Sequence, residues 1–204
     1  MTKTKIAVFV SGGGTNLQAL IDAQHAGILN SGEIVLVVAS QPTAYALERA
    51  KKAGIKGVVC SKKELGGQEA FEAAISAALK EHGIELIILA GFMSILSEGF
   101  TKQWPERIIN VHPSLIPSFC GKGFYGLTVH EKALEYGVKV TGATVHFVNE
   151  IPDGGKIIAQ KAVEILENDT PEVLQKRVME QAEWILLPQA AEAVSAKIAK
   201  EKEA

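Results

Sequence analysis

Short apolar runs alternate with segments of helical period along the first half of this chain, and that alternation restricts the fold more than any other feature. Runs rich in Val, Ile and Leu occupy residues 6–10, 34–39, 57–60, 86–90 and 108–111. Between them, residues 15–26 and 68–82 carry apolar side chains three or four positions apart, as helices with one core-facing side do. Continuous apolar strands separated by helices are typical of a parallel sheet covered on both faces. We therefore expect an α/β fold with a Rossmann-like, doubly wound sheet.

The pattern changes after Val111. Residues 140–148 and 156–163 are expected to form two long strands, joined through the turn residues 152–155, and to pair antiparallel at the end of the mostly parallel sheet. Thr170 and Pro171 open a further helix, which Pro188 is expected to interrupt. No repeat or linker divides the chain, so residues 1–204 are expected to form a single domain.

Composition excludes several classes of protein. The 21 basic and 23 acidic residues give a net charge of −2, so no basic surplus predicts a nucleic-acid partner. The two cysteines, Cys60 and Cys120, lie far apart, and no set of His, Cys and acidic residues has the spacing of a metal site, so we expect neither a disulfide nor a metal. No apolar stretch is long enough for a signal peptide or a membrane span. These features predict a cytoplasmic protein without a membrane partner.

The first strand leads into a glycine-rich loop. Ser11-Gly12-Gly13-Gly14-Thr15-Asn16 connects it to a helix. Backbone N–H groups in such a loop, together with the helix N-terminus, can hold a phosphate. The alternative is a capped turn without a ligand, because Thr15 and Gln18 have capping-box spacing. The loop lacks both the P-loop lysine and the full dinucleotide fingerprint, which favours a phosphate monoester.

Polar residues end the fifth apolar run. Asn110 and His112 are two positions apart, so in an extended chain they point to the same side. An amide donor beside an imidazole suits acyl transfer, in which one group stabilises an oxyanion and the other moves protons. Asp153, in the turn between the two late strands, is a candidate partner that would raise the pKa of His112. The alternatives are a structural His-Pro pair and an Asp that only shapes its turn.

The remaining histidines are expected to have structural roles or to lie in solvent. His146 shares a strand face with Thr144 and is expected to be a hydrogen-bonded structural histidine or a group supporting the site. His25, His82 and His130 fall in predicted helices and are expected to be solvated or capping residues.

Five ordered blocks together resemble a known family. They are Ser-Gly-Gly-Gly-Thr-Asn-Leu at 11–17, Leu-Ala-Gly-Phe-Met at 89–93, Asn-Val-His-Pro-Ser-Leu-Ile-Pro at 110–117, Thr-Gly-Ala-Thr-Val-His-Phe-Val at 141–148 and Asp-Gly-Gly at 153–155. In this order they resemble the folate-dependent phosphoribosylglycinamide formyltransferase family. The resemblance implies an enzyme of purine biosynthesis that takes a formyl group from 10-formyltetrahydrofolate and gives it to the amine of glycinamide ribonucleotide. It implies small-molecule partners and a monomer or homodimer.

The resemblance also implies roles for particular residues. Asn110, His112 and Asp153 match the catalytic trio, Gly14, Thr15 and Asn16 match the phosphate site, and Glu183 matches a contact to the ribonucleotide. The folate-binding residues would be Met93, Ser94, Ile95, Leu96, Asn110, Val148, Asn149, Glu150, Ile151 and Asp153. Residues 1–105 would then form the phosphate-binding half, and residues 106–204 the catalytic and folate-binding half.

This chain departs from the family pattern at two places. Gln68 and Ser94 stand where the family commonly has arginine, so contacts to the folate tail would be weakened or transferred, with Lys62 or Lys63 as replacements. Residues 120–127 form a longer, glycine-rich connection, which is expected to be a mobile flap near the site.

Three competing functions are weighed against this one. Methionyl-tRNA formyltransferase resembles the same domain but needs a C-terminal nucleic-acid-binding domain, for which 204 residues leave no room. Formyltetrahydrofolate hydrolase usually has an extra N-terminal domain, which is expected to be absent because the first strand begins near residue 5. A nucleotide-binding module without chemistry would need Gly-x-Gly-x-x-Gly and an acid after the second strand, whereas that strand ends Ala39-Ser40-Gln41.

Overall fold

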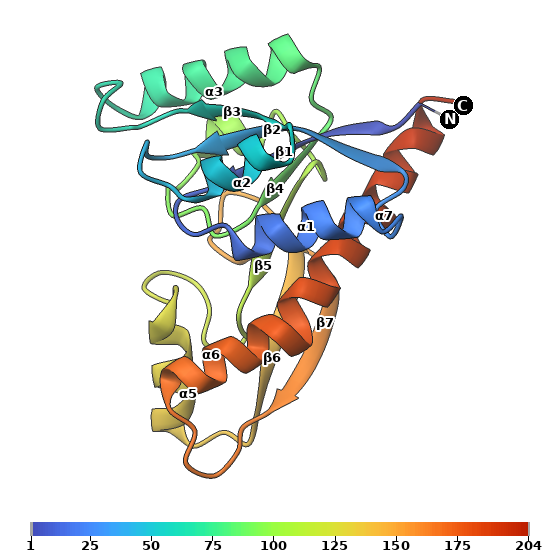
Figure 1. Ribbon diagram of the computed structural model, residues 1–204. Coiled ribbons are helices and arrows are strands. Elements are labelled where there is room, and N and C mark those ends of the chain that lie inside the picture. Colours follow the sequence, from blue (N-terminus) through green and yellow to red (C-terminus); the bar gives the residue numbers. More distant parts are fainter. Residues whose placement is uncertain (1, 204) are drawn as a thin grey trace.

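The computed structural model describes residues 2–203 and contains a seven-stranded sheet with the order β3-β2-β1-β4-β5-β6-β7 (Figure 1). The strands are β1 (Thr4–Val10), β2 (Gly32–Ala39), β3 (Lys56–Val59), β4 (Leu86–Leu89), β5 (Ile108–His112), β6 (Val140–Phe147) and β7 (Ile157–Glu164). Strands β1 to β5 pair in parallel, and β5-β6 and β6-β7 pair antiparallel. The expected mostly parallel α/β sheet with an antiparallel C-terminal pair is confirmed.

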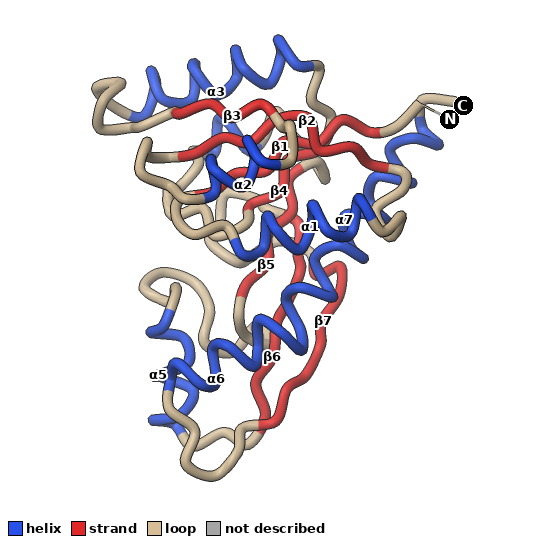
Figure 2. The backbone as a smooth tube through the Cα atoms, in the orientation of Figure 1, coloured by secondary structure: helices blue, strands red, loops and turns tan. Residues whose placement is uncertain are grey.

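Helices cover both faces of the sheet, as the backbone tube in Figure 2 shows. They are α1 (Thr15–His25), α2 (Ala46–Lys52), α3 (Gln68–His82), α4 (Glu98–Thr101), α5 (Leu127–Tyr136), α6 (Pro171–Val178) and α7 (Trp184–Glu201). One core cluster contains apolar side chains of α1, α2 and α7, and the other contains those of α3 and α4. Helices α5 and α6 pack against each other at the lower end of Figure 1.

Strand β1 shows why the sheet is buried on both sides. Ile6, Val8 and Val10 belong to the cluster with α1 and α7, whereas Ala7 and Phe9 belong to the cluster with α3. All five side chains are fully buried, because successive side chains of a strand point to opposite faces. Burial of a large apolar side chain contributes about 1.5–3 kcal/mol to the stability of the fold. All five residues of this run are buried only because helices cover both faces of the sheet.

The C-terminal helix differs from the expectation. Helix α7 continues through Pro188, and the irregular turn is a π-helix, η1 (Met179–Glu183), which precedes it. Proline removes one hydrogen bond and crowds the carbonyl four residues earlier. Pro188 is nevertheless buried with Leu187 and Ala191, so packing of α7 against the sheet offsets the cost. The prediction that Pro188 ends the helix is therefore wrong.

The strand order places three loops next to one another. Strands β1, β4 and β5 are neighbours in the sheet and are parallel, so their carboxyl ends lie at one edge. The chain leaves β1 toward β2 on one side, whereas β4 lies on the other side, which makes the β1/β4 boundary the switch point where α/β sheets bind ligands. Within residues 2–203, no helix has the length and apolar character needed to cross a membrane.

Candidate active site

The glycine-rich loop forms the first wall of the candidate site. Gly14 is the N-cap of α1 and has φ 71°, a left-handed conformation that glycine adopts without strain. A Cβ there would also lie 2.6 Å from the Cβ of Ala46, so α2 leaves no room for a side chain. Thr15 is the first helical residue and makes no capping bond, which contradicts the capping-box alternative. The loop therefore ends at the N-terminus of α1, where no side chain caps the helix.

The segment after β4 forms the second wall. Its chain is tied to the end of β1, since Ser11 N donates to Gly91 O at 3.1 Å and Met93 N donates to Ser11 Oγ at 2.8 Å. Met93 and Ile95 are exposed, by 56% and 74%, whereas Leu96 is buried in the core. Two of the four residues expected to bind folate in this segment thus offer apolar surface to a ligand.

Asn110 and His112 occupy the carboxyl end of β5. They pair with His146 and Thr144 of β6 and lie on one side of the sheet, as their spacing predicts. His146 Nδ1 lies 2.8 Å from Phe147 O and His146 Nε2 lies 3.2 Å from Asn110 Nδ2. A carbonyl only accepts, so Nδ1 carries the proton and Nε2 accepts from Asn110. The interpretation of His146 as a hydrogen-bonded histidine is confirmed, and it orients the Asn110 amide.

Asp153 reaches this pair from the turn between β6 and β7. Its Oδ2 lies 3.5 Å from His112 Nδ1, and its Oδ1 lies 3.6 Å from His146 Nε2. Gly121 N donates to Oδ2 at 2.8 Å. Burial raises the pKa of Asp153, but His146, His112 and the Gly121 N–H together lower it below its usual value. Asp153 is therefore a partly buried carboxylate that faces both imidazoles.

The turn that carries Asp153 is closely packed. Asp153 has φ 55°, a left-handed conformation that Asp tolerates better than most residues. A Cβ on Gly155 would overlap the carbonyl oxygen of Phe147, so only glycine fits there. Ile151 N donates to Asn149 Oδ1 at 3.0 Å, and the Ile151 side chain is 58% exposed. Of the other expected folate residues, Val148 is tied to β5 through Ile108 O and Glu150 is exposed.

The environment of His112 corrects one expectation. Burial lowers the pKa of His112 more than the Asp153 carboxylate and the Phe119 carbonyl raise it, whereas the sequence suggested a raised pKa. His112 Nε2 lies 2.9 Å from Phe119 O, so Nε2 carries the proton in the neutral ring. Nδ1 then faces Asp153 with a lone pair. A second proton on Nδ1 would turn this contact into an ion pair, and any nearby negative charge would favour that protonation.

Glu183 lies on the same side of the molecule as the glycine-rich loop. It belongs to the π-helical turn η1, is 6% exposed, and accepts a hydrogen bond from Asn16 Nδ2 at 2.7 Å. Burial raises the pKa of Glu183, and the Asn16 amide lowers it by less. π-Helical turns often occur at functional sites, and this one brings Glu183 to the expected phosphate loop.

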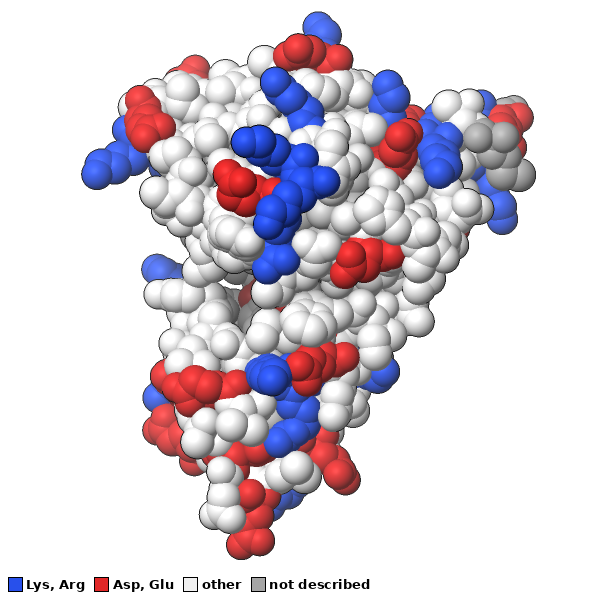
Figure 3. Space-filling view, in the orientation of Figure 1, with Lys and Arg blue, Asp and Glu red and all other residues white. Residues whose placement is uncertain are grey.

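The glycine-rich stretch 120–127 contacts the site directly. Gly121 N donates to Asp153, and the carbonyl of Phe119, the residue immediately before this stretch, accepts from His112. In Figure 1 this loop (yellow) and the start of α1 (blue) face each other, and Figure 3 shows the surface hollowed between them.

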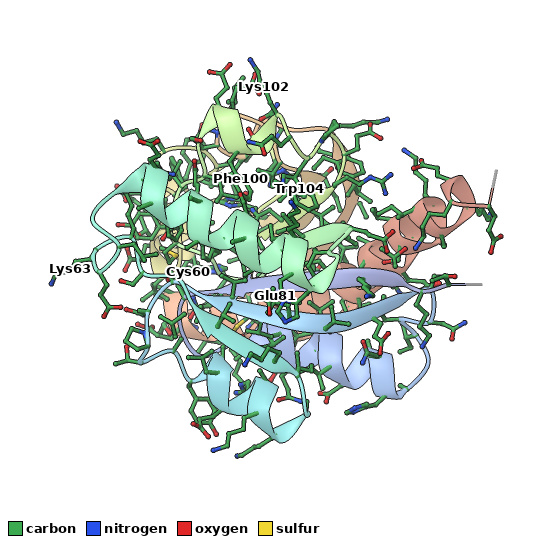
Figure 4. All side chains as sticks on the ribbon, turned by 90° about the horizontal axis from the view of Figure 1, so that it is seen from above. Cys60, Lys63, Glu81, Phe100, Lys102 and Trp104 are labelled. Atoms are coloured by element: carbon green, nitrogen blue, oxygen red, sulfur yellow. The ribbon has the colours of Figure 1, made fainter. Side chains whose placement is uncertain are left out.

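His130 is not in the environment that its place in a predicted helix suggested. His130 is fully buried on α5, neither ring nitrogen has a partner within residues 2–203, and burial, with a smaller effect of His112, lowers its pKa to about 4. The expectation that His130 is solvated or capping is wrong, because α5 turns that face into the protein. Lys63 is exposed and points into solvent from the loop before α3 (Figure 4).

Sequence reasoning did not find two supporting groups. These are the Ser11 hydroxyl, which accepts from Met93 N, and Glu72, which accepts from Ser97. Their polar contacts connect residues 25 or more positions apart, and no local pattern marks them. A groove of about 490 Å³ between α1 and α7 reaches Thr15 and Arg49, but its lining does not include Asn110, His112 or Asp153. In the described part of the chain, no cluster of His, Cys, Asp or Glu is placed to hold a metal ion.

The chain is similar to several known proteins. A family model described as formyl transferase matches residues 4–190. The phosphoribosylglycinamide formyltransferase of Haemophilus influenzae is 41% identical over 177 residues, which cover 87% of this chain and 81% of that protein. The trifunctional purine biosynthetic protein adenosine-3 of Gallus gallus is 46% identical over 95% of this chain, but this chain spans 18% of that protein.

Solved structures match in three dimensions as well. The phosphoribosylglycinamide formyltransferase of Brucella melitensis has a TM-score of 0.87 and 42% identity, and the match covers 96% of this chain and 97% of that one. Glycinamide ribonucleotide transformylase 1 of Symbiobacterium toebii has a TM-score of 0.88 and 38% identity, with coverage of 96% and 89%.

Proposed function

This chain belongs to the formyl transferase family, and we propose that it transfers the formyl group of 10-formyltetrahydrofolate to the amine of glycinamide ribonucleotide. The observation that carries the proposal is the convergence of Asn110, His112 and Asp153 at the carboxyl end of β5, two strands from the β1 strand that leads into the loop of residues 12–16. An amide donor, an imidazole and a carboxylate suit acyl transfer, and the loop suits a phosphorylated acceptor.

The acceptor would bind through its phosphate to the backbone of Gly14, Thr15 and Asn16. The helix N-terminus of α1 supplies partial positive charge there. Glu183, held by Asn16 at 2.7 Å, would accept hydrogen bonds from the sugar. This placement leaves the amine directed toward the end of β5, which is separated from β1 in the sheet by β4.

The folate would bind as a second substrate against the segments 93–96 and 148–153. The exposed side chains of Met93, Ile95 and Ile151 provide the apolar surface that a flat ring system requires. The main chain of both segments is fixed at its ends by bonds to Ser11 and to β5. The site is thus largely preformed for a planar ligand.

The reaction divides among the three central residues. The amine nitrogen forms a bond to the formyl carbon, negative charge develops on the formyl oxygen, and the bond from that carbon to the folate nitrogen then breaks. One N–H of Asn110 is used by His146, and the other, which has no partner among residues 2–203, can donate to the charged oxygen. That negative charge also raises the pKa of His112, and Asp153 stabilises the imidazolium. The amine loses one proton, and the departing folate nitrogen gains one.

Both partners in this proposal are small molecules, and the setting is the cytoplasm. Residues 1–204 would act as one domain, with the phosphate site contributed before residue 106 and the catalytic trio after it. The lysines and arginines that gather over α2 in Figure 3 belong to the outer surface of that phosphate-binding half.

The test follows tetrahydrofolate release from 10-formyltetrahydrofolate spectroscopically, with and without glycinamide ribonucleotide. The purified protein is compared with His112→Ala and with His25→Ala, whose side chain is exposed on α1. Turnover that needs the ribonucleotide, is lost in His112→Ala and persists in His25→Ala supports the proposal. Turnover without the ribonucleotide would assign a hydrolase instead, and none under either condition would indicate a nucleotide-binding module.

A further inference from the structure

The loop between β4 and α4 has no regular secondary structure, yet it carries four of the residues that the proposed function assigns to folate. Residues 93–97 lie outside any helix or strand. A ligand that meets such a loop gains affinity when the loop is already fixed in its bound conformation. The contacts that fix these residues therefore bear on folate binding.

One carboxylate on the neighbouring helix α3 holds the far end of this loop. Glu72 Oε1 accepts from Ser97 N at 2.6 Å, and Glu72 Oε2 accepts from Ser97 Oγ at 2.6 Å. Gln68 Nε2 donates both to Glu72 Oε1 and, at 3.1 Å, to Ile95 O. Main-chain atoms on both sides of Leu96 are thus attached to α3.

Packing completes the attachment. Leu96 is 8% exposed and lies in the same apolar cluster as Phe71 of α3. Phe100, on α4, belongs to this cluster and lies beside α3 in Figure 4. Ser97 is also the N-cap of α4, so the carboxylate of Glu72 fixes the loop and the start of the next helix together.

Glu72 is charged at neutral pH. Burial raises its pKa, but hydrogen bonds from Ser97 and Gln68 and the charge of Lys62 together lower it below the usual value. Hydrogen bonds to a charged acceptor are stronger than those between neutral groups. A carboxylate that accepts three of them holds its donors in one geometry.

We propose that Glu72 is a positioning residue for the folate substrate, and that it acts by holding residues 93–97 against α3 through Ser97 and Gln68. This inference rests on the proposed function. It assigns Gln68, which stands where the family commonly has arginine, to the support of the loop, because its amide is used by Glu72 and Ile95.

The test compares Glu72→Gln with Glu69→Gln, a matched change at an exposed position of the same helix. In Glu72→Gln one of the two carboxylate oxygens is replaced by an NH₂ group, which cannot accept from the donors of Ser97 and Gln68. We expect KM for 10-formyltetrahydrofolate to rise about tenfold, with kcat and KM for the ribonucleotide within about twofold, the pattern of lost ground-state binding. Glu72→Asp is expected to restore part of the affinity, and Glu69→Gln to change nothing.

Amide hydrogen exchange supplies a readout that does not need turnover. Exchange in residues 93–97 is expected to quicken in Glu72→Gln and to stay unchanged in Glu69→Gln, because local protection depends on the contacts that hold a loop. Unchanged exchange and an unchanged KM for the folate would overturn the proposal, and so would equal losses for both substrates. Absence of turnover in the unaltered protein would contradict the proposed function instead, and the exchange result would still decide whether Glu72 holds the loop.

Discussion

Replacement of His130 is expected to make the protein less sensitive to acid. His130 lies on α5 with its side chain fully buried, and its two ring nitrogens have no partner among residues 2–203. Burial, with a smaller effect of the nearby His112, lowers its pKa from 6.5 to about 4. His130→Leu removes the titrating group and retains an apolar side chain of similar reach.

The direction of the effect follows from proton binding. The unfolded chain binds a proton at His130 near pH 6.5, whereas the folded chain binds it near pH 4. Between these values the unfolded chain holds more protons, so the free energy of unfolding falls as the pH falls. The whole difference corresponds to about 3 kcal/mol, of which roughly 2.5 kcal/mol is already lost at pH 4.5.

The assay is urea unfolding at pH 7.0 and pH 4.5, followed by circular dichroism. Carboxylates also titrate in this range, so the relevant quantity is the difference between variants in the stability lost from pH 7.0 to pH 4.5. We expect His130→Leu to lose roughly 2 kcal/mol less than the unaltered protein. His130→Gln should behave in the same way, and the exposed His25→Gln should not. An equal loss in all four proteins would refute the argument.

Three further changes test the site itself. Asp153→Asn keeps an acceptor for Gly121 N but removes a negative charge 3.5 Å from His112 Nδ1. The lost attraction between carboxylate and imidazolium is at most roughly 5 kcal/mol, so we expect kcat to fall on the order of 100-fold while the melting temperature stays nearly unchanged. A kcat within threefold of the unaltered protein would contradict this. Gly155→Ala forces a Cβ onto Phe147 O and should displace the turn, abolishing turnover, whereas retention of activity in steady-state assays would show that the turn can shift. Asn16→Ala leaves Glu183 buried without its donor and should lower the free energy of unfolding by about 2 kcal/mol at pH 7, to be measured by urea unfolding; no loss would mean that Glu183 finds another partner.

Local patterns predicted most of the architecture. The five apolar runs became β1 to β5, and the two late runs became the antiparallel pair β6 and β7. These predictions succeed because a strand buried on both faces must be apolar throughout. The prediction at Pro188 failed, since the packing of α7 outweighs the local cost of proline.

The electrostatics of the site could not be predicted in the same way. The spacing of Asn110 and His112 predicts a shared side, and they share it. The pKa of His112 depends on how much protein surrounds the ring, and His130 is buried only because α5 turns toward the core. Burial is a property of the packed molecule, and no residue type or spacing in the chain specifies its extent at one atom.

The sequence alone thus determined the class of fold, the glycine-rich loop and the polar end of β5, because short-range sterics and the periodicity of apolar residues act between near neighbours. The tertiary structure decided which distant groups meet: Asp153 with His112 and His146, Asn16 with Glu183, and Glu72 with Ser97. These contacts join residues that are 7 to 167 positions apart along the chain, and they form because the folded sheet brings strand ends and helices to one edge. Free energies of charges and hydrogen bonds depend on distances of a few ångströms and on the exclusion of water, and only the packed fold sets both.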